Sequence, residues 1–324
     1  MVARPRVFVT RRMPGDALDR LAAEADVDLW PDEMPPPYED LARHARDADG
    51  LICMLTDRVD GRLVGPASRL RVISQMAVGY DNIDVAFATA RGIPVGNTPG
   101  VLTEATADLT FALILAVARR VVEAERFLRD GRWRTWDPSG LLGLELSGAT
   151  LGIVGYGKIG RAVARRAGGF GMDIVVANRS PVADSDVRQM SLDEVLGASD
   201  IVTLHVPLSP DTKHLIAAPQ LRAMKDTAFL INTARGPIVD QPALADALHA
   251  GTIAGAGLDV AEVEPIPAGD PLLAAPNCVL LPHIGSATLA TRSRMASMAV
   301  DNCLAGLRGD PLPNCVNPET QVGR

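Results

Sequence analysis

The stretch Leu151-Gly152-Ile153-Val154-Gly155-Tyr156-Gly157-Lys158-Ile159-Gly160 decides the fold of this chain. It starts as a short apolar strand and continues as the glycine pattern GxGxxG, which leads into a helical pattern. In such a turn Gly155 permits the tight bend, Gly157 lets the backbone approach a pyrophosphate, and Gly160 lets the helix pack against the strand. The N–H groups at the helix start, including those of Lys158-Ile159, favour phosphate oxygens. The stretch therefore predicts a dinucleotide-binding unit.

The tip of the next predicted strand, Asp173–Ala177, indicates which dinucleotide is bound. Enzymes that use NAD usually place a carboxylate there to bind the ribose 2′-hydroxyl, about 20 residues after the glycine turn. Here the strand is followed by Asn178, Arg179 and Ser180, and no carboxylate stands among them. Arg179 can pair with a 2′-phosphate, to which Asn178 and Ser180 can donate. This pattern favours NADPH, with NADH, bound by looser contacts, as the alternative.

Apolar runs alternate with helical stretches on both sides of the glycine turn, which is the pattern of parallel sheets covered by helices. From the turn onward, strands are predicted at Leu151–Val154, Asp173–Ala177, Ile201–His205, Ala228–Asn232, Ala254–Leu258 and Val279–Leu281. Upstream, strands are predicted at Val7–Thr10, Leu51–Leu55, Arg71–Gln75 and Ile93–Gly96. The fold class is therefore α/β, with two Rossmann-like, doubly wound parallel-sheet domains.

The order of these elements predicts that one domain is inserted into the other. The helical stretch Ala287–Leu307 follows a completed sheet, so it can pack back on the N-terminal domain. Residues 1–99 and 287–324 then form a substrate-binding domain, and residues 100–286 form the dinucleotide-binding domain. A single long helix is predicted at Thr103–Arg129, and its apolar middle should be buried between domains or subunits. The segment 131–146, with Trp133 and Trp136, is predicted to be a loop.

Length and composition describe a globular chain of two domains with no nucleic-acid or membrane character. The chain has 324 residues, of which 47% are hydrophobic and 22% charged, and its formal net charge is −7. An acidic chain without a basic run argues against nucleic acid as a partner. The longest apolar run, Phe111–Ala118, is far below the ~20 residues that span a bilayer. Four scattered cysteines favour reduced thiols in a cytoplasm and predict neither a disulfide framework nor a metal site.

Three segments with catalytic side-chain types follow later strands, where open α/β sheets bind their ligands. Arg235 follows the first, several carboxylates lie in Gly257–Pro265 after the second, and His283 follows the third. Reduction of an anionic keto acid needs this set, because the arginine holds the anion, the histidine gives a proton and a carboxylate keeps that histidine protonated. Taken singly, each could be an ordinary structural residue. His205, at another strand end, is a rival histidine.

In its order of motifs, the chain resembles the D-isomer-specific 2-hydroxyacid dehydrogenases. The matching motifs are Val78-Gly79-Tyr80-Asp81-Asn82-Ile83-Asp84, Gly155–Gly160, Asn232-Thr233-Ala234-Arg235-Gly236, Leu258-Asp259-Val260 with Glu264-Pro265, and Pro282-His283-Ile284-Gly285-Ser286. They cover nearly the whole chain. The resemblance implies that Arg235, Glu264 and His283 are the catalytic residues.

The resemblance also implies binding residues. Asp259 would bind the nicotinamide amide, and the backbone of Val78 and Gly79 would bind the substrate carboxylate. Substrate contacts are further expected from Arg235 itself and, at the pocket, from Met54 and Ser286. The remaining residues expected to line the cofactor are Thr106, His205, Val206, Pro207, Thr233 and Gly285. A homodimer is the expected assembly.

Within the family, the chain looks most similar to the glyoxylate/hydroxypyruvate reductases. This rests on Leu55-Thr56-Asp57, Trp133-Arg134-Thr135-Trp136, Asn178-Arg179-Ser180 and the tail Leu304–Pro311; Ala261 and Val263, before the catalytic glutamate, depart from the usual pattern. The expected reaction is NADPH-dependent reduction of glyoxylate or hydroxypyruvate. The alternatives are an NAD-dependent dehydrogenase acting on phosphoglycerate, D-lactate, formate or phosphite, and a non-catalytic protein that senses nucleotides.

Overall fold

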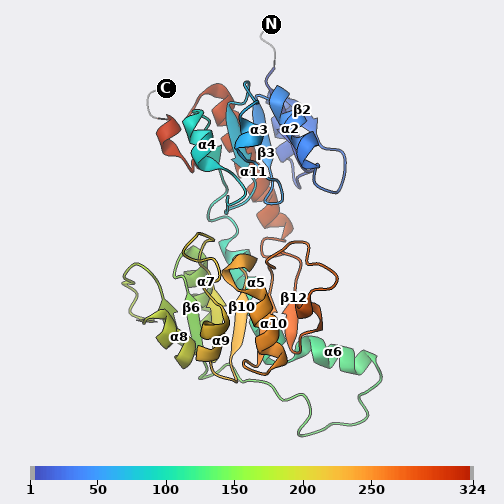
Figure 1. Ribbon diagram of the computed structural model, residues 1–324, viewed down its shortest axis with the longest axis vertical. Coiled ribbons are helices and arrows are strands. Elements are labelled where there is room, and N and C mark those ends of the chain that lie inside the picture. Colours follow the sequence, from blue (N-terminus) through green and yellow to red (C-terminus); the bar gives the residue numbers. More distant parts are fainter. Residues whose placement is uncertain (1–3, 322–324) are drawn as a thin grey trace. The chain divides into compact units, whose positions relative to one another are not determined.

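The computed structural model describes residues 4–321 and divides into two units by its internal contacts. Unit 1 combines the chain up to Leu102 with the segment from Ser286 onward, and unit 2 is Thr103–Gly285. Each unit is an all-parallel sheet with helices packed on it (Figure 1). This confirms the predicted class of two Rossmann-like α/β domains. Unit 2 lies in sequence between the two pieces of unit 1.

Unit 1 has a five-stranded sheet with the order β2-β1-β3-β4-β5. Its strands are β1 Arg6–Val9, β2 Asp26–Leu29, β3 Gly50–Cys53, β4 Val72–Gln75 and β5 Val95–Gly96. Its helices are α1 Ala17–Glu24, α2 Tyr38–Asp47, α3 Gly61–Val64, α4 Val85–Ala90 and α11 Leu289–Arg308, and a 3-10 turn covers Pro318–Gln321. Strands β3 and β4 are buried throughout, as parallel strands covered on both faces must be.

Helix α11 closes one face of this sheet and joins the C-terminal segment to the N-terminal part of the chain. It packs on β3, β4 and α1. A Cβ on Gly306 would lie 2.6 Å from side-chain atoms of Val72, so a glycine is needed where the helix comes closest to β4. The strand β2 was not predicted. Its sequence Asp26-Val27-Asp28-Leu29 alternates polar and apolar residues because it is a partly exposed edge strand.

Unit 2 has a seven-stranded sheet with the order β12-β11-β10-β9-β6-β7-β8. Its strands are β6 Thr150–Val154, β7 Asp173–Ala177, β8 Arg188–Gln189, β9 Ile201–Leu204, β10 Phe229–Asn232, β11 Gly255–Leu258 and β12 Cys278–Leu280. Its helices are α5 Thr103–Ala118, α6 Val121–Arg129, α7 Lys158–Gly169, α8 Leu192–Ala198, α9 Ala218–Ala223 and α10 Gln241–His249, with 3-10 turns at Gly236–Ile238 and Pro271–Ala274. Six strands were predicted here, and the seventh is the two-residue edge strand β8.

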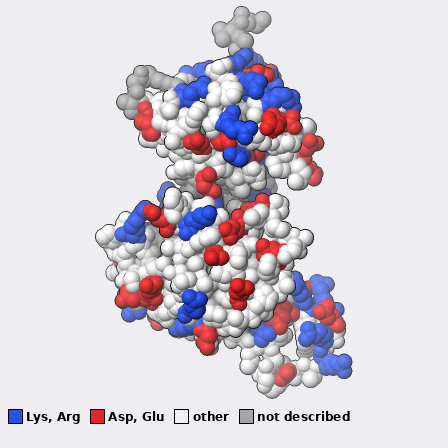
Figure 2. Space-filling model, viewed as in Figure 1, with Lys and Arg blue, Asp and Glu red and all other residues white. Residues whose placement is uncertain are grey.

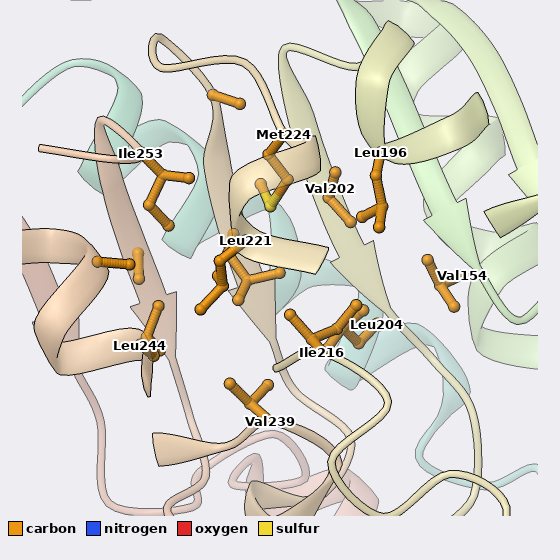
Figure 3. Packing of buried hydrophobic residues seen from close by; sticks show 14 of the residues in the cluster. Val154, Leu196, Val202, Leu204, Ile216, Leu221, Met224, Val239, Leu244 and Ile253 are labelled. Atoms are coloured by element: carbon orange, nitrogen blue, oxygen red, sulfur yellow. The ribbon is translucent and has the colours of Figure 1, made fainter. Parts of the chain in front are cut away.

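The chain reverses its direction of winding next to β6, so the carboxyl ends of β6 and β9 form a topological switch point. From β6 it continues to β7 and β8 on one side, and then returns to β9 on the other side. Such a switch point is where open α/β sheets bind nucleotides. One sheet face is sealed by apolar side chains from β6 and β9 that pack against α8, α9 and α10 (Figure 3). This core holds the strand ends in register.

The predicted single helix Thr103–Arg129 is wrong, because the structure has two helices. Helix α5 ends at Ala118, and Arg120 takes a left-handed conformation with φ of 53° before α6 begins. The returning loop explains the break, since the Leu144 N–H donates to the Ala118 carbonyl at 2.8 Å. Helix α5 packs on β10, β11 and α7 of its own unit, whereas α6 has no buried residue and projects from the unit (Figure 1).

Among the described residues, we find no helix with the length and apolarity needed to cross a bilayer.

Candidate active site

The turn between β6 and α7 has the geometry of a pyrophosphate site. Gly155 has a φ of +96°, and a Cβ on it would lie 2.7 Å from the carbonyl carbon of His205. A Cβ on Gly160 would lie 2.3 Å from the Gly155 carbonyl oxygen, but one on Gly157 would meet no protein atom within 4 Å. Between residues 4 and 321, the N–H groups of Lys158-Ile159 have no protein acceptor. The open space beside Gly157 and these N–H groups fit a pyrophosphate.

The tip of β7 carries the exposed guanidinium of Arg179, and the turn there is held by side-chain hydrogen bonds. The Asn178 side chain supports this turn, because its Oδ1 accepts from the Tyr156 N–H at 3.0 Å and its Nδ2 donates to the Ser180 carbonyl at 2.9 Å. Arg179 is exposed and has no hydrogen-bond or ion-pair partner within the described part of the chain. Its charge is therefore available to a ligand, and the predicted pairing with a 2′-phosphate stays a prediction.

A buried tyrosine connects this turn to the loop before β8. The Tyr156 hydroxyl donates to Asp184 Oδ2 at 2.7 Å, and the Arg161 guanidinium lies 4.6 Å from the centre of the Tyr156 ring. Burial, with the hydrogen bond to Asp184, raises the pKa of Tyr156 to about 12. The phenol therefore stays protonated at neutral pH and keeps the loop attached. Sequence reasoning missed this contact because Tyr156 and Asp184 are far apart in sequence.

Arg235 stands at the carboxyl end of β10, on an extended and half-buried backbone. The turn is closed locally, since Asn232 Nδ2 donates to the Arg235 carbonyl at 2.9 Å. The next residue, Gly236, allows a close approach, because a Cβ on it would lie 1.9 Å from the carbonyl carbon of Ala261. The glycine therefore lets the Arg235 turn pack against the segment that carries Glu264. Its importance could not be found from sequence, since Ala261 comes from another strand end.

Glu264 and His283 form a hydrogen-bonded pair. Glu264 Oε2 and His283 Nδ1 are 2.8 Å apart, and Glu264 Oε1 accepts from the Ala261 N–H at 3.1 Å. Burial would raise the pKa of Glu264, but the hydrogen bond and charge of His283, together with the charge of Arg235, hold that pKa below its usual value. Glu264 is therefore a carboxylate at neutral pH, and its negative charge lies against Nδ1 of the His283 ring. The three predicted catalytic side chains are thus coupled in unit 2.

Asp259 shapes the backbone on which His283 stands. Its Oδ1 accepts from the Ile284 N–H and its Oδ2 from the Gly285 N–H, both at 2.7 Å. Its own carbonyl accepts from the His283 N–H at 2.9 Å, and His283 has a left-handed φ of 55°. Burial raises the pKa of Asp259, while these two N–H groups oppose that shift. Asp259 therefore holds the His283 turn, and its predicted contact with a nicotinamide amide stays a prediction.

Threonine hydroxyls connect three more of the predicted cofactor residues of unit 2, namely Thr106, Thr233 and Gly285. Thr106 Oγ1 donates to the Gly285 carbonyl at 3.4 Å, and Thr110 Oγ1 donates to the Thr106 carbonyl at 2.8 Å. Thr110 Oγ1 also lies 3.0 Å from Thr233 Oγ1. Sequence reasoning missed Thr110. The available signal was a hydroxyl four residues after Thr106, on a helix face that is otherwise apolar.

The rival His205 is unsuited to be a cationic acid. Its Nε2 lies 3.0 Å from Thr203 Oγ1, and burial lowers its pKa to about 3. It is therefore neutral at physiological pH. Its N–H donates to the Val154 carbonyl, so it places the half-buried Val206 and the exposed Pro207 beside the glycine turn.

The other predicted substrate residues lie in unit 1. Val78 and Gly79 follow β4, Met54 follows β3, and Ser286 begins the C-terminal segment of the unit. Met54 is half-buried, and its N–H donates to Asp57 Oδ2 at 2.7 Å. Among residues 4–321, no group of three or more His, Cys, Asp or Glu side chains is arranged to hold a metal ion.

Comparisons with known proteins identify the family. The family profile "D-isomer specific 2-hydroxyacid dehydrogenase, NAD binding domain" matches residues 111–285. A glyoxylate reductase of Korarchaeum cryptofilum is 52% identical over 98% of this chain and 97% of its own length. A glyoxylate reductase of Thermococcus litoralis is 47% identical over 98% of both chains. This chain belongs to the D-isomer-specific 2-hydroxyacid dehydrogenase family.

Solved structures agree with this assignment. A protein from Thermus thermophilus superposes with a TM-score of 0.92 at 51% identity, over 96% of this chain and 99% of that one. An NADPH-dependent glyoxylate/hydroxypyruvate reductase from Sinorhizobium meliloti, solved with NADP and malonate, superposes with a TM-score of 0.86 at 36% identity over 99% of both chains. The chain is therefore an oxidoreductase of the family whose fold and motifs the sequence analysis recognised.

Proposed function

We propose that the protein uses NADPH to reduce a small 2-keto acid, glyoxylate or hydroxypyruvate, to the 2-hydroxy acid, of D configuration where that carbon is stereogenic. The main supporting observation is the hydrogen-bonded pair of Glu264 and His283, whose atoms are 2.8 Å apart. The charge of Arg235 acts on Glu264, and all three residues lie in the unit that contains the glycine turn. The glyoxylate reductases that resemble this chain support the choice of substrate. When bound, the reduced nicotinamide supplies the hydride.

His283 is the proposed proton donor. Its Nδ1 is engaged by Glu264, so Nε2 is the ring atom left to protonate the keto oxygen. Glu264 stays ionised, so its negative charge faces the ring that would give its proton to the keto oxygen as charge develops there. Asp259 holds the backbone after this histidine through the Ile284 and Gly285 N–H groups, and the contact of Nδ1 with Glu264 orients the ring.

Arg235 and two backbone groups are the proposed anchors of the substrate. The Arg235 guanidinium would bind the carboxylate and polarise the keto oxygen. The N–H groups of Val78 and Gly79 would bind the same carboxylate, and neither donates to a protein acceptor within residues 4–321. Met54 and Ser286 would limit the size of the substrate side chain.

Arg179 is the residue that we propose selects NADPH over NADH. It is exposed and unpaired within the described chain, and no carboxylate stands beside it at the tip of β7. The 2′-phosphate supplies the negative charge that this position lacks. The NADP-bound reductase from Sinorhizobium meliloti, which resembles this chain, supports the same choice.

We also propose that the protein forms a homodimer through the arm of α6 and the loop that follows it. The apolar side chains left exposed there include Trp136 at 77%, Leu142 at 67% and Trp133 at 60%. Large exposed apolar side chains gathered on one element are typical of an interface. Figure 2 shows that this arm also carries charges of both signs, in agreement with ion pairs such as Arg120–Glu123 at 2.7 Å. Size-exclusion chromatography with light scattering tests the assembly.

The cytoplasm is the proposed compartment. All four cysteines are free thiols, and burial raises the pKa of Cys303 to about 12, so it stays protonated and unreactive. Buried free thiols of this kind suit a reducing compartment.

The decisive experiment measures initial rates of NADPH and NADH oxidation side by side with glyoxylate, hydroxypyruvate, pyruvate and phosphohydroxypyruvate. Fast turnover of NADPH with the first two supports the proposal. Turnover only with NADH, or only with another keto acid, assigns the protein to another branch of the family. If no pair reacts while NADPH still binds, the proposed function is wrong.

A further inference from the structure

The loop after β4 has its carbonyl groups held by protein while its N–H groups stay available. Three donors from unit 1 hold three successive carbonyl oxygens: Thr98 N on Ala77 at 2.9 Å, Asn97 Nδ2 on Val78 at 2.8 Å and Gln75 Nε2 on Gly79 at 3.3 Å. By contrast, the N–H groups of Val78, Gly79 and Tyr80 have no protein acceptor in the described chain. Such a division is unusual, because backbone donors are nearly always paired unless water or a ligand takes them.

These carbonyl contacts determine where the N–H groups point. In a planar trans peptide, the C=O of one residue and the N–H of the next point in opposite directions. The peptides of this loop are trans, so the bond from Asn97 to the Val78 carbonyl directs the Gly79 N–H away from Asn97. The hydrogen bond from the Thr98 N–H to the Ala77 carbonyl likewise directs the Val78 N–H away from Thr98.

Asn97 is itself held by contacts that do not involve its side chain. Its N–H donates to the Asn314 carbonyl at 3.2 Å, and its carbonyl accepts from Asn302 Nδ2 at 2.9 Å. Asn302 is fully buried on α11, and its Oδ1 accepts from the Asn314 N–H at 3.0 Å. The Asn97 side chain is therefore not needed to hold its own backbone. Replacing this side chain leaves the backbone contacts with Asn302 and Asn314 in place.

We propose that Asn97 is a positioning residue for substrate binding: its side-chain amide fixes the Val78–Gly79 peptide so that the Gly79 N–H is aimed at the substrate carboxylate. The inference rests on the proposed function, in which this N–H binds that carboxylate. Of the two side chains that hold the loop carbonyls, Asn97 makes the shorter bond. Gln75 reaches Gly79 at 3.3 Å and is also bonded to Asn82 Oδ1 at 2.7 Å.

The test compares Asn97→Asp with a matched control, Asn317→Asp. The first variant exchanges the donating NH2 for an oxygen and adds a negative charge, so the Val78 carbonyl is no longer held. Asn317 belongs to the same unit, is buried and donates to the Ile93 carbonyl at 3.0 Å, but it does not contact the loop. For each protein we would measure KM and kcat with glyoxylate, the Kd of NADPH, and the Kd of oxamate, a non-reducible keto-acid analogue, with NADPH saturating.

In Asn97→Asp, the KM for glyoxylate and the Kd of oxamate should rise roughly ten- to hundredfold, which is the loss of one hydrogen bond to a charged group. The Kd of NADPH should not change, and kcat should fall less than KM rises. In Asn317→Asp the melting temperature should fall while both substrate constants stay at the wild-type values. Asn97→Ala, which adds no charge, should reproduce the change in KM and covers the case in which the aspartate variant does not fold.

Wild-type constants in both Asn97 variants would overturn the inference, as would an equal rise in Asn317→Asp or a wild-type protein that does not bind oxamate. The proposed function fails separately. If the wild type reduces no keto acid but binds oxamate, and the Asn97 variants bind it more weakly, the loop has the inferred role while the assigned reaction is wrong.

Discussion

Replacing Arg179 by alanine gives the sharpest test of how the dinucleotide is chosen. The guanidinium is exposed at the tip of β7 and has no protein partner in the described chain, so a 2′-phosphate would meet its whole charge. The neighbouring Asn178 amide is already used by Tyr156 and Ser180, which leaves Arg179 as the principal donor. NADH, which lacks the phosphate, should be bound equally well by both proteins.

The expected loss follows from the type of contact. A hydrogen bond to a charged group contributes about 1.5–3 kcal/mol, and exposure to water places this one in the lower half of that range. About 1.5–2 kcal/mol corresponds to a roughly 10- to 30-fold fall in kcat/KM for NADPH. Arg179→Asp should go further and favour NADH, because its carboxylate repels the phosphate and can accept from a ribose hydroxyl.

The assay compares kcat/KM for NADPH and NADH in wild type, Arg179→Ala and a control, Arg222→Ala. Arg222 is an exposed arginine on α9 of the same unit with no ion-pair partner in the described chain, so its loss changes the net charge equally. The NADPH effect should weaken as salt is raised, since an exposed pair is screened. An NADPH-to-NADH ratio in Arg179→Ala within about twofold of wild type, or an equal fall in Arg222→Ala, would refute the reasoning.

Four further substitutions probe the catalytic pair and the two glycine turns. His283→Ala should lose most turnover, by roughly 100-fold or more, and keep its NADPH affinity; unchanged turnover in rapid-mixing kinetics would contradict the assignment of the acid. In the wild type, activity should fall on the acid side only below the usual glutamate range near pH 4.3, because the lowered pKa keeps Glu264 ionised there. In Glu264→Gln the acid-side fall assigned to Glu264 should be absent, because the amide beside His283 does not titrate, and an unchanged acid limb would argue against the pair. Gly157→Ala should keep the wild-type melting temperature, since its Cβ meets no protein atom, but weaken NADPH binding about tenfold or more; a calorimetric Kd equal to wild type would place the pyrophosphate elsewhere. Gly236→Ala should do the reverse and lower the stability by about 1–3 kcal/mol, because its Cβ would overlap the Ala261 backbone; a wild-type denaturation curve would show that this approach is not tight.

Local patterns were sufficient for most of the fold. Strands such as β6 and β9 are short apolar runs between turn signals, and the glycine pattern stands between a predicted strand and a predicted helix, where it indicates a tight turn. Positions with weak local signals were missed. The edge strand β2 is half polar, and the two-residue β8 is too short to show any period.

In the candidate site, too, some features follow from local sequence and others depend on tertiary packing. The sequence alone determined which residue types follow which strands. Because parallel strands bring their carboxyl ends to one edge of a sheet, these side chains were expected to lie together there. Only the tertiary structure decided that Glu264 contacts Nδ1 of His283 and leaves Nε2 outside that contact, and that burial leaves His205 neutral. It also decided that α5 stops at Ala118, where a backbone N–H from a loop 26 residues later takes the helix carbonyl. These outcomes depend on atoms that packing brings together from positions far apart in the sequence. The local periodicity of apolar residues contains no information about such distances.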